Sequence, residues 1–265
     1  MSYLAARDEA PAAGTVYLVG AGPGDPGLLT RRAETILSGA TEVYHDYLVS
    51  PGVLACCGPH ARLIDVGKTG HGEQTAQHVI IDRLVASARA GHRVVRLKGG
   101  DPLLFGRGAE EALALEGAGI PFEIVPGVSS ALAVPALAGI PVTARGYASS
   151  VAIVTGHSDA GRPAPIPLAD TIVVLMGVAN AAVIRDQLLA TGLDPRTPSA
   201  VIEWGTWPQE RVVTAELHEL PDAIRRAGVG APAILVIGEV VRLRAHLAGS
   251  PARAVNEQAC SSGPE

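Results

Sequence analysis

The sequence predicts an α/β protein of two α/β domains, with mostly parallel or mixed sheets. Short apolar runs of strand length alternate with segments of helical periodicity, and this alternation occurs in both halves of the 265-residue chain. Strands that alternate with helices in this way form sheets with helices packed on their faces. A proline-flanked stretch between the halves, GIPVTARGYASS at 139–150, indicates a division into two domains.

The expected elements follow the apolar runs. Strands are expected at 15–20, 92–100, 151–156, 171–177, 199–206, 211–217 and 233–241, helices at 28–37, 106–117, 179–190 and 221–227, and a strand followed by a helix within 122–137. The domains are expected at 15–140 and 149–246, with a linker at 141–148 and mobile tails at 1–14 and 247–265. We expect the ligand in the cleft between the two domains.

The composition excludes several classes of protein. Hydrophobic residues make up 48% and charged residues 18%, which is typical of a folded globular chain. A net charge of −5 gives no basic field for nucleic acid. No apolar run approaches the ~20 residues of a membrane span, and the N-terminus lacks the apolar core of a signal peptide. Cys56, Cys57 and Cys260 have no metal-ligand spacing. We therefore expect a cytoplasmic protein without a nucleic-acid, membrane or metal partner.

A glycine-rich turn, VGAGPGDPGLLT at 19–30, follows the first apolar run. Its glycines and the downstream Asp46 partly match the dinucleotide-binding fingerprint, which leaves an NAD(P)-linked oxidoreductase as an alternative. Asp25 stands where that fingerprint needs its third glycine, and the prolines of the turn restrict its closure around a pyrophosphate. A tight turn without a ligand is the structural alternative.

The longer motifs are more specific than the glycines alone. GAGPGDPGLLT is followed in order by RLKGGDPLLFGRGAEE (96–111), VPGVSSA (125–131), AGIPVT (138–143), VTGH (154–157), LMGVAN (175–180), RVVT (211–214) and PAILVIGEVV (232–241). With these motifs, the chain resembles the uroporphyrinogen-III C-methyltransferases of the tetrapyrrole methyltransferase class, from about residue 15 to residue 245.

The resemblance implies a homodimer of two-domain subunits that hold S-adenosylmethionine, with S-adenosylhomocysteine as its product, in the interdomain cleft. It implies a cofactor site formed by Pro23, Gly99, Gly100, Asp101, Leu104, Ser129, Ser130, Met176, Pro232 and Ala233. Glycines let the backbone approach a ligand closely, and an aspartate attracts the cofactor's ammonium and sulfonium charges. Asp101 also suits a helix N-cap or a turn, so both roles stay open.

Methylation of a ring carbon is an in-line displacement, so positioning is the main task of the enzyme. The resemblance implies that Arg107, Glu110 and Arg145 contact the substrate. The i,i+3 spacing of Arg107 and Glu110 favours, by itself, a simple surface ion pair. A nearby group can remove a proton from the acceptor. The candidates for this base are Tyr47, Glu110 and His157, in falling order.

Three arginines of the family pattern are replaced. Tyr47, next to Asp46, and Thr69, next to Lys68, stand in for two of them. Trp204 replaces the third, and Trp207 lies close by. Arginines anchor carboxylates in pairs of hydrogen bonds, so their loss disfavours a polycarboxylate and favours a neutral aromatic acceptor. Packing of both tryptophans at an interface is the structural alternative.

We therefore expect a small, electron-rich heteroaromatic acceptor. Carbon 3 of the indole in a tryptophan-containing cyclic dipeptide, giving a pyrroloindoline in secondary metabolism, is the preferred case. The expected substrate residues are Asp46, Arg145, Trp204 and Trp207. One alternative is a genuine uroporphyrinogen-III C-methyltransferase that makes precorrin-2 in porphyrin biosynthesis. Another is a cofactor-binding module without catalysis.

Overall fold

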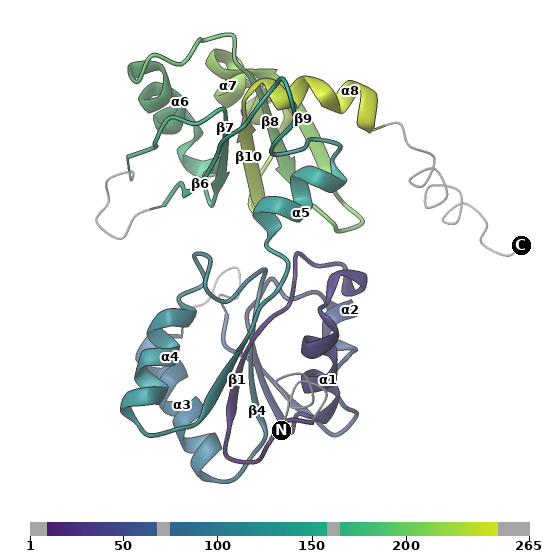
Figure 1. Ribbon diagram of the computed structural model, residues 1–265, viewed down its shortest axis with the longest axis vertical. Helices are drawn as coiled ribbons and strands as arrows, with labels where there is room; N and C mark the ends of the chain where they lie inside the picture. The colour runs from purple at the N-terminus through teal and green to yellow at the C-terminus, as the bar shows by residue number, and fades with distance from the viewer. Residues whose placement is uncertain (1–9, 68–74, 158–164, 249–265) are drawn as a thin grey trace, which may run out of the picture. The chain divides into compact units, whose positions relative to one another are not determined.

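A computed structural model describes residues 10–67, 75–157 and 165–248 of the chain (Figure 1). The chain divides into two compact units, Met1–Ser130 and Ala131–Glu265. Residues 141–148, the expected linker, belong to the second unit. Lys68, Thr69, Cys260 and most of both expected tails lie outside the described residues.

The first unit is built on a five-stranded, fully parallel sheet with the order β3-β2-β4-β1-β5. Its strands are β1 (Val16–Gly20), β2 (Glu42–His45), β3 (Arg62–Asp65), β4 (Val94–Lys98) and β5 (Phe122–Val125). Its helices are η2 (Pro26–Leu28), α1 (Arg31–Gly39), α2 (Pro51–Leu54), α3 (Gln77–Arg89) and α4 (Gly108–Gly117), and α5 (Ser130–Leu137) begins at the boundary of the units. Figure 1 shows α1 and α2 on one side of this sheet and α3 and α4 on the other.

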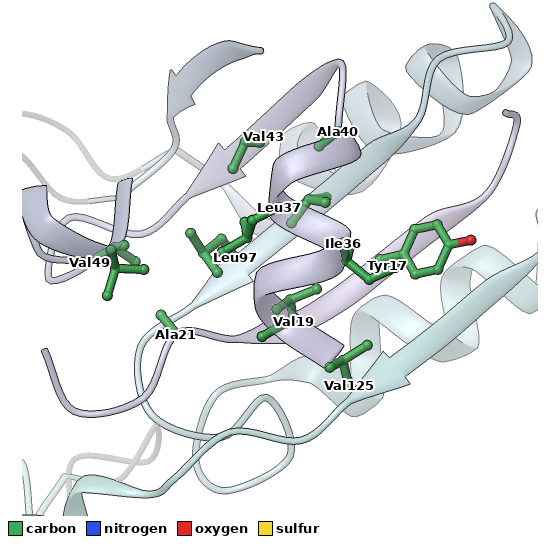
Figure 2. Packing of buried hydrophobic residues seen from close by; sticks show 13 residues of the cluster. Tyr17, Val19, Ala21, Ile36, Leu37, Ala40, Val43, Val49, Leu97 and Val125 are labelled. Atoms are coloured by element: carbon green, nitrogen blue, oxygen red, sulfur yellow. The ribbon is translucent and has the colours of Figure 1, made fainter. Parts of the chain in front are cut away.

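Side chains along β1 point alternately to the two faces of the sheet, and each face carries its own hydrophobic core. Tyr17 and Val19 pack with Ile36 and Leu37 of α1 in the first core (Figure 2), whereas the adjacent Leu18 belongs to the second core. The second core includes Val16, Leu84 of α3 and Leu115 of α4. All five strand residues are buried, as expected for a central strand that is covered on both faces.

The second unit contains a mixed sheet with the order β6-β7-β10-β8-β9. Its strands are β6 (Val151–Thr155), β7 (Thr171–Leu175), β8 (Pro198–Glu203), β9 (Arg211–Glu216) and β10 (Ala233–Ile237). Only β6 and β7 pair in parallel. Its helices are η3 (Val178–Asn180), α6 (Ala181–Ala190), η4 (Leu217–Glu219), α7 (Leu220–Ala227), η5 (Glu239–Leu243) and α8 (Arg244–Leu247). Helices α6 and α7 pack on β7, β8 and β10 in one core.

One parallel and one mixed sheet, each with packed helices, confirm the predicted fold class. The strand expected over 233–241 is shorter than predicted and ends at Ile237. Gly238 adopts a φ of 143°, a backbone conformation open mainly to glycine, and turns the chain into η5. None of the described helices combines the length and the apolar character that a membrane span requires.

Candidate active site

Three loops leave the same edge of the parallel sheet in the first unit. Gly20 pairs with Lys98, and Val19 pairs with Val125, so β1, β4 and β5 end at the same level. The loops that follow are 21–25, 99–107 and 126–129. Ligands of α/β sheets bind at the carboxyl ends of the strands. The expected residues Pro23, Gly99, Gly100, Asp101, Leu104, Ser129 and Ser130 all lie in these loops or at the start of α5.

Glycines allow these loops to touch. A side chain at Gly127 would place its Cβ 2.2 Å from the carbonyl oxygen of Gly100, and one at Gly20 would place it 2.5 Å from the Gly127 backbone. Gly22 and Gly100 also exchange backbone hydrogen bonds of 3.2 and 2.8 Å. A Cβ at Gly99, by contrast, would meet no atom within 4 Å. The packed glycines hold the loops together, and the open side of Gly99 is compatible with a ligand against its backbone.

Asp101 ties two of the loops together. Its Oδ1 accepts the backbone N–H of Leu103 at 2.9 Å, and its Oδ2 accepts the N–H of Gly127 at 3.1 Å. Because α4 begins only at Gly108, Asp101 is not a helix N-cap. The side chain is half-buried, and each ionised carboxylate oxygen has a second lone pair that can accept a ligand ammonium. Asp101 can therefore hold the two loops together and bind a cofactor at the same time.

The loop between Asp101 and α4 has an unusual backbone. Phe105 and Arg107 have positive φ values of 53° and 59°, which are uncommon for residues other than glycine and occur often at functional sites. The Arg107 guanidinium donates to both carboxylate oxygens of Glu110, with Nε–Oε1 at 3.0 Å and Nη2–Oε2 at 2.8 Å. This pairing with Arg107 lowers the pKa of Glu110. The exposed ion pair that the spacing favoured is therefore present, and it holds Glu110 ionised.

A buried charge cluster beneath this loop was not predicted from the sequence. Oε1 of the fully buried Glu111 accepts Arg96 Nε at 3.0 Å, Lys98 Nζ at 3.1 Å and Gln77 Nε2 at 3.0 Å. Its Oε2 has no hydrogen-bond partner among the described residues. Burial and the neighbouring Arg96 charge lower the pKa of Lys98. For Arg96, burial opposes the charge, but Asp46 and Glu111 outweigh it and raise the pKa.

The cluster reaches the surface through Asp46, directly after β2. Arg96 Nη2 donates to Asp46 Oδ1, which fixes this expected substrate residue from below. The adjacent Tyr47 is 51% exposed. Gly67, after β3, packs so closely that a Cβ there would lie 2.2 Å from the Tyr47 nitrogen. The structure therefore places Asp46 and Tyr47 at the carboxyl end of β2, next to β4 in the sheet.

The second unit gathers most of its expected site residues at one edge of its sheet. Thr155 pairs with Leu175, Leu175 with Ile234, and Ala233 with Glu203. The residues at this edge are His157, Met176, Pro232, Ala233 and Trp204. Met176 is half-exposed and has a φ of 55°.

The two tryptophans pack against each other. The ring centroids of Trp204 and Trp207 are 5.1 Å apart, edge to face. Both side chains are half-buried, so much of their aromatic surface stabilises their own turn. Arg145 lies in a separate tight turn, closed by hydrogen bonds between Ala144 and Ala148, and it is exposed. Among the described residues, no group of His, Cys, Asp or Glu is arranged to hold a metal ion.

Comparisons with known proteins agree with this geometry. The family model "Tetrapyrrole (Corrin/Porphyrin) Methylases" matches residues 15–221. A uroporphyrinogen-III C-methyltransferase of Synechocystis is 46% identical over 242 residues, which cover 88% of this chain and 92% of the relative. A siroheme synthase of Azotobacter vinelandii is 47% identical over 243 residues, which cover 89% of this chain but 52% of the relative. The chain thus spans about half the length of the siroheme synthases that it matches.

A solved structure of similar fold contains a ligand. The uroporphyrin-III C-methyltransferase of Thermus thermophilus, complexed with S-adenosylhomocysteine, superposes with a TM-score of 0.76. The two chains are 44% identical, and the match covers 86% of this chain and 99% of the neighbour. The family match and this neighbour confirm the expected resemblance, the methyltransferase class and S-adenosylmethionine as the cofactor.

Proposed function

The chain belongs to the tetrapyrrole methylase family, and we propose on this basis that it is a uroporphyrinogen-III C-methyltransferase that uses S-adenosylmethionine. The observation that carries the proposal is the 46% identity to the Synechocystis enzyme of that name over nearly the full length of both chains. Precorrin-2 would then be the product, in porphyrin biosynthesis. We also propose a homodimer, as the resemblance implies.

The cofactor fits the loop edge of the first unit. S-adenosylmethionine supplies an activated methyl group when it is bound. The open side of Gly99 leaves room for a ligand along the backbone, and the half-buried Asp101 carboxylate suits a cationic one. In the second unit, Met176, Pro232 and Ala233 share one sheet edge, and the family resemblance implies that they too belong to the cofactor site. We propose these residues, together with Pro23, Leu104, Ser129 and Ser130, as the cofactor site.

The residues proposed for the substrate supply both charge and orientation. Arg107 and Arg145 are exposed cations that suit the carboxylates of a porphyrinogen. Asp46 is held by the buried Arg96, so its position is fixed before a substrate binds. Its second oxygen could accept a hydrogen bond from a pyrrole N–H, or the proton that the ring releases after methyl transfer. Glu110 already pairs with Arg107, and the exposed Tyr47 stays a candidate for orienting the ring.

The expected preference for an indole acceptor has less support than its alternative. The relatives quoted above carry uroporphyrinogen or siroheme names, at 44–47% identity. Trp204 and Trp207 pack on each other, which gives both rings a structural role. Thr69 lies outside the described residues, so only Tyr47 still favours a neutral aromatic substrate. We therefore retain the cyclic dipeptide only as a comparison substrate.

The test offers both acceptors to one enzyme. Wild-type protein is incubated with methyl-labelled S-adenosylmethionine and either uroporphyrinogen III or a tryptophan-containing cyclic dipeptide. We expect label in the tetrapyrrole. Arg107→Met should reduce kcat/KM by roughly ten- to a hundredfold, because a charged hydrogen bond contributes about 1.5–3 kcal/mol. Arg225→Met, in an exposed ion pair with Asp222 on α7, serves as the matched control. Label in the dipeptide alone would overturn the proposal.

A further inference from the structure

An ion pair between the buried Glu203 and the half-exposed Arg211 holds the loop that precedes β10 in the second unit. Glu203, at the end of β8, is only 6% exposed. Its Oε1 accepts the backbone N–H of Gly230 at 2.7 Å. Its Oε2 lies 2.7 Å from Nε and 2.5 Å from Nη2 of Arg211, the first residue of β9. The two residues face each other directly in the strand register, so the β8–β9 pairing itself brings their charges together.

Arg211 extends the same connection to the end of α7. Its Nη1 donates to the carbonyl oxygen of Ala227 at 3.2 Å, and its Nη2 donates to that of Gly228 at 3.1 Å. Ala227 is the last residue of α7 and Gly228 is its C-cap, and carbonyls at a helix C-terminus lack partners within the helix. The guanidinium therefore joins the strand pair to the place where the chain leaves α7.

The result is a loop fixed at successive points. Gly228 is anchored through Arg211, Gly230 through Glu203, and Pro232 through its carbonyl oxygen, which accepts the Trp204 N–H at 3.0 Å. Ala233 then enters the β10–β8 pairing opposite Glu203. A turn that needed only to connect α7 with β10 would not require a buried carboxylate, because burying a charge costs free energy unless it is fully paired.

We propose that Glu203 and Arg211 are positioning residues that order the 228–232 loop so that Pro232 and Ala233 can receive the adenosyl part of the cofactor. This inference rests on the cofactor site proposed above. A loop that occupies its binding conformation only part of the time weakens the apparent affinity by that fraction. The pair increases affinity by keeping the loop in one conformation, without touching the ligand.

The experiment compares three variants by calorimetric titration with S-adenosylhomocysteine. Glu203→Gln keeps an acceptor for Gly230 but loses the charge that pairs with Arg211. Arg211→Lys keeps the charge but loses the fork that reaches both carbonyls, and its half-exposed position favours folding. Glu239→Gln, which breaks an exposed i,i+3 pair with Arg242 in the same unit, is the matched control. All titrations are made well below each variant's melting temperature.

We expect the Kd for S-adenosylhomocysteine to rise about five- to tenfold in the Glu203 and Arg211 variants, and to stay within twofold in the control. The KM for S-adenosylmethionine should rise with it, whereas kcat at saturating cofactor should be retained. Hydrogen exchange should accelerate at Gly230 and its neighbours but not in β7. If the pair only stabilised the fold, hydrogen exchange would accelerate throughout the second unit. The cofactor KM would then not rise on its own while kcat is retained.

Two results overturn the inference. One is an unchanged Kd in a variant whose Gly230 amide exchanges faster, because loop order would then not control binding. The other is a fall in kcat without a rise in the cofactor KM. If Glu203→Gln does not fold, the Arg211→Lys result decides alone. Because the titration needs no methyl acceptor, failure to convert uroporphyrinogen III would leave this test intact. Failure of the wild type to bind S-adenosylhomocysteine would instead refute the proposed cofactor site.

Discussion

Replacing Glu111 by Gln would remove the only anion that contacts Lys98 within the described part of the chain. Glu111 is fully buried and accepts three hydrogen bonds on Oε1, from Arg96, Lys98 and Gln77. The glutamine keeps the shape and one carbonyl oxygen but removes the negative charge. Arg96 would still be paired with Asp46, whereas Lys98 would be left as a buried cation without an anion in direct contact.

The expected cost can be bounded in two ways. Removing one partner of a buried ion pair typically costs about 3–5 kcal/mol. Lys98 can also avoid its unpaired charge by losing its proton. At pH 7 this costs an ordinary lysine about 4.6 kcal/mol, at about 1.36 kcal/mol for each of roughly 3.4 pH units. The loss of stability is therefore limited to about 3–5 kcal/mol, and the retained amide oxygen places the variant at the lower end.

The pH dependence of the stability loss in Glu111→Gln tests whether the unpaired Lys98 charge causes that loss. Burial lowers the pKa of Lys98 in the folded protein, so protonation favours the unfolded chain. The variant's stability deficit should therefore be largest near pH 7 and should shrink as the pH rises towards the ordinary lysine pKa. Urea unfolding followed by circular dichroism at pH 7 and pH 9.5 measures both quantities.

The adjacent residue provides the control. Glu110→Gln, on the same helix, breaks a half-exposed pair with Arg107 and should cost less than about 1 kcal/mol in stability at either pH. If Glu111→Gln is also destabilised by less than about 1 kcal/mol, Lys98 is not held by Glu111 and the cluster has no energetic role. A deficit that does not change with pH would refute the assignment to Lys98.

Three further results are expected. Asp101→Ala removes one hydrogen bond within the loop after β4 and the one that joins it to the loop after β5. It should weaken S-adenosylhomocysteine binding at least tenfold by calorimetry, and an unchanged Kd would show that these bonds are dispensable. Tyr47→Phe should lower kcat if the hydroxyl orients the acceptor, whereas a change under twofold would leave only ring packing. Burial raises the pKa of Cys57 to about 11, so iodoacetamide should label this thiol much more slowly in the folded protein at pH 8 than in urea, as mass spectrometry of the peptide can measure.

The central strands could be predicted from the sequence because burial on both faces produces a continuous apolar run. VYLVG at β1 and AILVI at β10 are buried throughout and lie within the strands predicted at 15–20 and 233–241, although β10 ends at Ile237. β3 was missed because it is an edge strand whose four residues, RLID, are mostly exposed. β2 was missed because it begins with Glu42, a buried carboxylate that accepts hydrogen bonds from Tyr44, Ser87 and Arg62. That partnership depends on residues up to 45 positions away in the chain.

The candidate site was predictable where backbone geometry dictated the residue type. The three segments can meet only if Gly20 and Gly127 carry no side chains, and Gly100 has a φ of 67° that favours glycine. These backbone requirements explain why glycines occupy all three positions. The Glu203–Arg211 pair was harder to predict from the sequence. Arg211 lies in the RVVT motif and Glu203 directly precedes Trp204, but their contact depends on the register between β8 and β9. Residue types alone do not give that register.

Glu110 and Glu111 show what decides the role of a charge. In sequence they are identical neighbours, and the motif matching singled out only the first. One helical position corresponds to a rotation of about 100°, which turns Glu110 to solvent and Glu111 towards β4. On β4, Arg96 and Lys98 are two positions apart and so face the same side, the side that α4 covers. Two cations spaced by two within an apolar strand therefore require an anion on the covering helix. The rotation of α4 about its axis brings Glu111 to these two cations and leaves Glu110 at the surface, where it pairs with Arg107.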